Sequence, residues 1–219
     1  MPPTIWPPRP VSLVPAPRRR AWWVVVGLGV LVVAGGVIVH GDAQPLGIEL
    51  RIQHGVDAHA GTAARWDTVF NTGIPWGIGL TLLGLGSWAL ATRWWRALAA
   101  CAAVPLAIAI TEAVLKPLVG RHFSGVYGYP SGHVTGVAAA VTLGSVLLGF
   151  RLRERPAVVL LVGLALGLCA AAVLAAVASH AHGPVDTVAG LPTGAAVARA
   201  WMLAIDALAA AVTTARSPA

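Results

Sequence analysis

Three short segments of this 219-residue chain combine histidine with residues that favour anions. In PSGH, residues 130–133, the helix-capping residue type Ser131 is followed by Gly132 and His133. Glycine lets an anion approach the backbone closely, and the free amides of a helix N-terminus attract negative charge. His133 is then placed to donate a proton to a leaving oxygen. The segment therefore predicts chemistry on an anionic group.

A second histidine lies in HAHGPVD, residues 180–186. Asp186 follows His182 by four residues, so their side chains are neighbours if the turn is helical. A carboxylate beside an imidazole fixes its tautomer and stabilises its cation, and the other ring nitrogen is then free to attack as a nucleophile. Upstream, Lys116 and Arg121 supply positive charge for several anionic oxygens.

These residues together predict phosphoryl transfer with one nucleophile, one acid and one anion cradle, and with no metal or other cofactor. A metal site is the alternative, because two histidines and one carboxylate form a common metal-binding triad. That alternative leaves Lys116 and Arg121 unexplained, since both would repel a cation. The two cysteines, Cys101 and Cys169, lie within apolar runs and indicate neither a metal site nor a disulfide framework.

The elements that carry these residues have the composition of membrane-spanning helices. Hydrophobic residues make up 57% of the chain and charged residues 11%, whereas an ordinary soluble domain has about 25% charged residues. A spanning helix needs about 20 mostly apolar residues. Six runs meet this requirement, at residues 22–40, 74–92, 97–115, 133–150, 157–178 and 186–207. We therefore expect an all-α, polytopic membrane protein with six transmembrane helices.

The basic residues follow the positive-inside pattern. If the spans alternate in direction, one side carries the arginines Arg9, Arg18, Arg19, Arg20, Arg93, Arg96, Arg151, Arg153, Arg155 and Arg216. The other side carries Arg51, Arg65, Lys116 and Arg121. Both termini are therefore expected in the cytoplasm. The net charge of +7 is scattered between apolar runs, a distribution that argues against a nucleic-acid partner.

Short connections between the spans leave room for one domain only. We expect residues 1–21 to be a disordered cytoplasmic tail, residues 22–210 to form the membrane domain and residues 211–219 to be a second cytoplasmic tail. The longest connection, residues 41–73, is expected to be an extracytoplasmic loop that holds an interfacial helix or forms a lid.

Alternation of the six spans also gathers the polar segments. The third span ends at Lys116, the fourth begins at Ser131 and the sixth begins near His182, and all three ends face the same side. Ionisable groups near the bilayer are expensive and often functional. One shared extracytoplasmic site is the economical interpretation.

The same segments resemble the three motifs of the type 2 phosphatidic acid phosphatase superfamily, which includes lipid phosphate phosphatases and polyprenyl pyrophosphate phosphatases. They are KPLVGRHF (116–123), PSGH (130–133) and HGPVD (182–186). The pattern LKPLVGR followed by YPSGH is similar to that of actinobacterial members, so the chain resembles a divergent member from that group.

The resemblance implies a role for each site residue. His182 would be the nucleophile that forms a phosphohistidine, with Asp186 orienting it, and His133 would protonate the leaving group. The phosphoryl oxygens would be held by Lys116, Arg121, Ser131 and Gly132.

Two arginines of the family pattern are missing. Phe123 stands where the first motif has its arginine, and Ala175 and Ala176 stand where the third motif has its Ser-Arg pair. Arg121 is the expected substitute for the first arginine. The expected substitutes for the second are His180, chosen as a substrate-binding residue, His122 or Arg51.

The resulting expectation is a phosphatase of the bacterial cytoplasmic membrane, with its active site on the extracytoplasmic face and a lipid phosphate or polyprenyl (di)phosphate as substrate. Its partners are the lipid substrate and the bilayer. Two alternatives remain on the same fold. One is a binder or transporter of lipid phosphates that has lost the arginine clamp, and the other is a phosphotransferase that passes the phosphoryl group to an acceptor.

Overall fold

The computed structural model of the chain describes residues 12–14, 17–42, 44–123, 126–149, 152 and 154–215. Within these ranges, six helical segments are long and apolar enough to cross a membrane. They are Arg18–Ile38, Ala63–Ala91, Trp95–Val119, Gly132–Gly149, Arg155–Ala178 and Pro184–Ala215. The prediction of an all-α chain with six spanning helices is confirmed.

Four of the spans are single helices, and two contain a π-helical turn. The single helices are α1 (Arg18–Ile38), α8 (Gly132–Gly149), α9 (Arg155–Ala178) and α10 (Pro184–Ala215). The second span consists of α3 (Ala63–Thr68), the π-helical turn η1 (Val69–Gly73) and α4 (Ile74–Ala91). The third consists of α5 (Trp95–Ala100), α6 (Ala103–Ile110), the π-helical turn η2 (Thr111–Leu115) and α7 (Lys116–Val119).

The second and the last span exceed their predicted lengths the most. The second begins at Ala63 rather than at residue 74, because η1 joins α3 to α4 without a break. The last continues to Ala215, through an alanine-rich stretch that favours helix. Pro192 lies inside this helix, as membrane helices tolerate when neighbouring elements satisfy the freed carbonyl.

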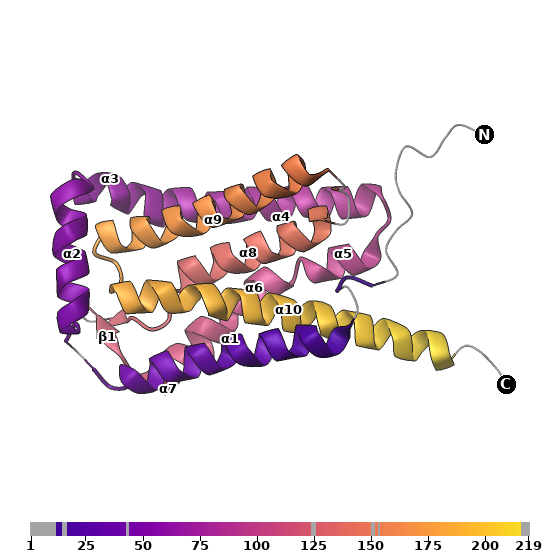
Figure 1. Cartoon of the computed structure of the whole chain (residues 1–219), viewed down its shortest axis with the longest axis horizontal. Coiled ribbons are helices and arrows are strands. Elements are labelled where there is room, and N and C mark those ends of the chain that lie inside the picture. Colours follow the sequence, from indigo (N-terminus) through magenta and orange to yellow (C-terminus); the bar gives the residue numbers. More distant parts are fainter. Residues whose placement is uncertain are drawn as a thin grey trace.

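The six spans lie side by side and alternate in direction, as Figure 1 shows. At one end of the bundle, α2 (Gly47–His59) crosses over the helix ends, and the hairpin of β1 (His122–Phe123) and β2 (Val126–Tyr127) lies nearby. α1 begins and α10 ends at the opposite end. The long connection thus contains one helix, α2, and Gly61, with φ of 80°, separates it from α3 of the second span.

α8 is the central helix, and α10 packs tightly against it. A Cβ atom at Gly190 would lie 2.9 Å from Val134 Cβ, and one at Gly194 would lie 2.7 Å from the Ala139 amide nitrogen. Glycine at these two positions lets the helix backbones approach closely, as is common between membrane helices. The start of α10 is thereby fixed against the start of α8.

A buried carboxylate holds part of the N-terminal segment at the far end of the bundle. Asp206 of α10 accepts hydrogen bonds from the amides of Leu13 and Val14, both at 2.9 Å, and lies 3.7 Å from Arg96 Nη1. Within the expected tail, residues 12–14 are thus fixed against α10, and residues 18–21 are helical. Residues 1–11, 15 and 16 lie outside the described residues.

Candidate active site

Ser131 joins the starts of α8 and α10. Its carbonyl accepts a hydrogen bond from the Thr135 amide at 2.9 Å, and its own amide donates to the Asp186 carbonyl at 2.9 Å. Ser131 is fully buried, yet its Oγ has no hydrogen-bond partner among the described residues. Buried polar groups are nearly always paired. An unpaired hydroxyl at a helix start is therefore suited to a ligand that accepts hydrogen bonds.

Both candidate histidines contact the same aromatic ring. Phe70, from η1, lies with its ring centroid 4.2 Å from that of His133 and 5.8 Å from that of His182. Phe70 itself is buried. The two imidazoles are thus on one side of the bundle and close together, as alternation of the spans predicts. The sequence suggested a lid in this region but gave no sign that Phe70 would touch both rings.

The environment of His182 keeps its ring neutral. Burial, together with the nearby Lys116 and His133, lowers the pKa of His182 from 6.5 to about 4, while the backbone of Gly128 acts in the opposite direction. His182 Nδ1 makes no hydrogen bond of good geometry within the described part of the chain. A neutral imidazole keeps a lone pair, which a nucleophile requires.

Asp186 binds an arginine and not the His182 ring. Its Oδ1 lies 3.3 Å from Arg121 Nη1, and its Oδ2 accepts a hydrogen bond from the Gly183 amide at 3.2 Å. The expected neighbour relation with His182 requires a helical turn, but α10 begins only at Pro184. The side chain in the first turn of α10 is therefore drawn to the buried cation and the free amide.

Arg121 is buried in a cluster with two carboxylates. Its Nη2 lies 2.6 Å from Glu49 Oε2 of α2, on the other side from Asp186. Arg121 and Glu49 are each only 1% exposed. Glu49 also accepts hydrogen bonds from the amides of Leu46 at 2.8 Å and Val185 at 3.0 Å, so it ties α2 to the start of α10. Sequence reasoning missed Glu49, which lies far from Arg121 in the chain.

Lys116 pairs with the carboxylate one turn before it. Lys116 Nζ lies 2.8 Å from Glu112 Oε2, and Glu112 is carried by η2. The other oxygen, Glu112 Oε1, lies against Gly132 in the space that a Cβ atom would occupy. Lys116, expected to hold an anionic oxygen, is thus near the start of α8 and is bound to a carboxylate there.

An apolar cluster stands where the third-motif arginine is missing. Ala175 and Ala176 are fully buried and pack with Phe70 and Val134. The space beside the two imidazoles at this end of α9 is therefore apolar. Phe123 stands at the position of the missing first-motif arginine, and its Cβ lies near Gly128. The Gly128 amide donates a hydrogen bond to the Arg121 carbonyl at 2.9 Å and so closes this loop.

Of the three expected substitutes for the third-motif arginine, two have other contacts and the third is exposed. His180, half-exposed, lies with Nε2 3.3 Å from Asp57 Oδ1 of α2. His122 is exposed and stacks on Tyr127, with ring centroids 4.7 Å apart. Arg51 is exposed on α2. Within the described ranges, no three His, Cys, Asp or Glu side chains form a group that could hold a metal ion.

These features define a six-span membrane protein with paired histidines beside the start of its central helix. The family model of the PAP2 superfamily matches residues 121–209. This match supports membership of the chain in that superfamily, which contains membrane phosphatases, and it covers the motifs at residues 130–133 and 182–186. The matched range runs from Arg121 through α8 and α9 into α10, so it includes both histidines. No curated protein and no solved structure matches the chain.

Proposed function

We propose that this protein is an integral-membrane phosphatase that hydrolyses a lipid phosphate or a polyprenyl (di)phosphate through a phosphohistidine. The observation that carries the proposal is the meeting of His133 and His182 on the Phe70 ring, beside an unpaired Ser131 hydroxyl. A nucleophile and an acid that flank an anion site are the groups that phosphoryl transfer needs.

The reaction has two steps. A ring nitrogen of His182 attacks phosphorus, the bond from phosphorus to the leaving oxygen breaks, and His133 gives its proton to that oxygen. His133 then takes a proton from water, which attacks the phosphohistidine and releases inorganic phosphate and a free His182. Lys116, the Ser131 hydroxyl and the start of α8 stabilise the phosphoryl oxygens in both steps.

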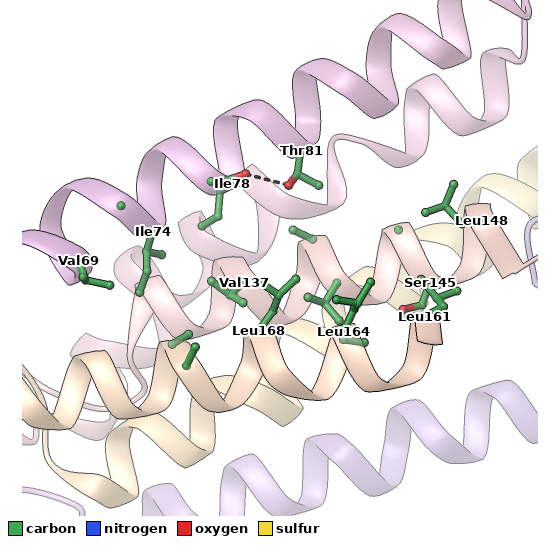
Figure 2. A pocket seen from close by; sticks show the side chains of 18 residues that line it. Val69, Ile74, Ile78, Thr81, Val137, Ser145, Leu148, Leu161, Leu164 and Leu168 are labelled. Atoms are coloured by element: carbon green, nitrogen blue, oxygen red, sulfur yellow. Dashed lines mark hydrogen bonds between the residues drawn. The ribbon is translucent and has the colours of Figure 1, made fainter. Parts of the chain in front are cut away.

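An apolar groove next to Phe70 supports a lipid substrate. It has a volume of about 540 Å³ and lies between α4, α8 and α9. Figure 2 shows it running from Val69 and Ile74 past Val137 to Ser145 and Leu148. Val69 lies next to Phe70 in η1 and Ile74 follows that turn, so the groove begins beside the turn whose Phe70 ring contacts both histidines. A headgroup held by the histidines would leave its apolar chain in this groove, facing the bilayer.

The distribution of charge supports an extracytoplasmic site. The histidines lie at the end of the bundle where α2 crosses, whereas Arg93 and Arg155 lie at the opposite end. Arginine-rich connections favour the cytoplasmic side. The site would then act on lipids in the outer leaflet of the cytoplasmic membrane.

The test is release of inorganic phosphate by the purified protein in detergent, with a chelator present. A long-chain polyprenyl phosphate, a polyprenyl diphosphate and phosphatidic acid are compared. We expect release from at least one of them. Binding of all three without release would instead support a lipid-phosphate binder, which the missing arginines favour, and phosphate recovered only on an added acceptor would support a transferase.

Filling the groove should affect lipid substrates alone. At Gly144, a Cβ atom would meet no described atom within 4 Å, so Gly144→Leu extends into the groove without a clash. We expect its KM for the lipid phosphate to rise about tenfold, with KM for p-nitrophenyl phosphate unchanged. Gly163→Leu, on α9 outside the groove lining and equally unobstructed, is the matched control. An equal change in KM for both substrates would show that the groove does not bind the lipid chain.

Phe70 should matter through the two imidazoles that it contacts. We expect Phe70→Ala to lower kcat by on the order of tenfold to a hundredfold, because the rings lose the surface that fixes their positions. Trp76→Ala, which removes an exposed aromatic ring from the following helix, should leave kcat unchanged. The measurement is the initial rate on p-nitrophenyl phosphate. A wild-type rate for Phe70→Ala would show that Phe70 has no positioning role.

A further inference from the structure

Both cations near the histidines are already paired with carboxylates. Arg121 lies between Glu49 and Asp186, and Lys116 lies 2.8 Å from Glu112. The pair formed by Glu49 and Arg121 is fully buried and ties elements together. Glu112 differs from Glu49 in two ways. It has no role in the proposed reaction, and no hydrogen bond from a backbone amide to it is seen among the described residues. Its position therefore calls for another explanation.

The Glu112 carboxylate lies where an anionic ligand would lie. Glu112 Oε1 occupies the space beside Gly132 that any side chain at residue 132 would fill. Gly132 is the first residue of α8, a helix of 18 residues. Negative charge at a helix start is stabilised by the free amides and the helix dipole. The carboxylate thus uses Lys116 and the helix start, which are two of the groups assigned to phosphoryl oxygens.

Two further groups at this end of the bundle are available to a ligand. Ser131 Oγ and His182 Nδ1 are buried and have no hydrogen-bond partner among the described residues. Glu112 satisfies neither of them. A phosphoryl group has more oxygens than a carboxylate, so it can accept from the Ser131 hydroxyl, next to Gly132 in the chain, as well as from Lys116 and the helix start.

The two members of the pair differ in their access to solvent. The side chain of Glu112 is 48% exposed, whereas that of Lys116 is 12% exposed. The carboxylate therefore has more room to move away from Gly132 than the ammonium has. Glu112 lies on η2, and π-helical turns inside α-helices often occur at functional sites.

We propose that Glu112 is an internal competitor for the phosphate. Its carboxylate occupies the place against Gly132 and Lys116 when no substrate is bound, and the incoming phosphoryl group displaces it. This inference rests on the proposed function, since it takes the same site to be the phosphate site. An anion then binds at this place only if its interaction with Lys116 and the helix start is stronger than that of the Glu112 carboxylate.

The test measures binding of orthovanadate, a phosphate analogue, by isothermal titration calorimetry of the full chain in detergent. We expect Glu112→Gln to bind orthovanadate about three- to tenfold more tightly than the unmodified protein. Glu112→Ala should do the same, which excludes an effect of the new amide. Glu154→Gln, which removes a carboxylate at the other end of the bundle, is the matched control.

Unchanged or weaker orthovanadate binding in both Glu112 variants would overturn the proposal, because the carboxylate would then be neutral or would help to position Lys116. Thermal unfolding in detergent identifies any variant that has lost its fold, and the remaining variant then decides. The binding test needs no turnover. Tighter orthovanadate binding without hydrolysis of any lipid would support the role of Glu112 and contradict the proposed phosphatase activity. Lipid hydrolysis with unchanged orthovanadate binding would contradict only the role of Glu112.

Discussion

Replacing His182 by alanine is expected to lower phosphate release by at least about a thousandfold in kcat, as loss of a nucleophile does in other enzymes. In the proposed mechanism the substitution removes the attacking nitrogen, and His133 cannot replace it because it serves the leaving oxygen. His182 is buried against Phe70 but makes no side-chain hydrogen bond of good geometry in the described structure, so the fold should persist. The measurement is kcat on the lipid phosphate, together with thermal unfolding in detergent.

His180 provides a matched control for His182. It lies in the same loop, two residues earlier, but is half-exposed and pairs with Asp57. We expect His180→Ala to retain a rate within about twofold of the unmodified protein, since surface substitutions away from a site have small effects. If His182→Ala kept most of its turnover, or if the two variants lost equal activity, His182 would not be the nucleophile and no phosphohistidine could form there.

The location of the site could be predicted because it depends on helix count and direction alone. Six apolar runs of spanning length force Lys116, Ser131 and His182 to one end of the bundle, whatever the packing between helices. The observed spans confirm the six runs. Histidines separated by many residues can therefore be placed at the same end without knowing which side of a helix faces which neighbour.

The aromatic contact could not be predicted, because it depends on local helix geometry. Phe70 and Glu112 lie in the π-helical turns η1 and η2, and one wider turn changes the direction of every side chain near it. The apolar runs around both turns read as ordinary helix. The sequence also gives no sign that Phe70 packs with Ala175 and Ala176, beside the position of a missing arginine.

The environment of Asp186 shows how a local rule can fail. A spacing of four residues favours contact with His182 only inside a helix, and α10 begins between the two residues. The stronger partner is Arg121, which a separate loop brings within 3.3 Å. Glu49 completes the cluster from α2. Long-range pairing of this kind depends on the arrangement of α2 over the bundle end, which hydropathy does not encode.

Arg121 should therefore matter first for stability. We expect Arg121→Ala to lower the free energy of unfolding by about 3–5 kcal/mol, because removing one partner leaves buried charges uncompensated. Glu49 and Asp186 would then face each other without a cation. The measurement is denaturation of the purified protein in detergent. His122→Ala, which alters the next residue but only an exposed ring, should change the free energy of unfolding by less than about 0.5 kcal/mol.

A second substitution distinguishes the buried cluster from a direct phosphate contact. If Arg121 serves mainly to compensate the two carboxylates, Arg121→Met combined with Glu49→Gln should recover part of the lost stability, since one of the uncompensated charges is also removed. If Arg121 instead holds phosphoryl oxygens, as its motif position suggests, Arg121→Ala would keep its stability and raise KM alone. A guanidinium already shared between two carboxylates at 2.6 and 3.3 Å has little capacity left for a third anion. The stability effect should therefore dominate, and Lys116 would remain the main cationic contact of the phosphate.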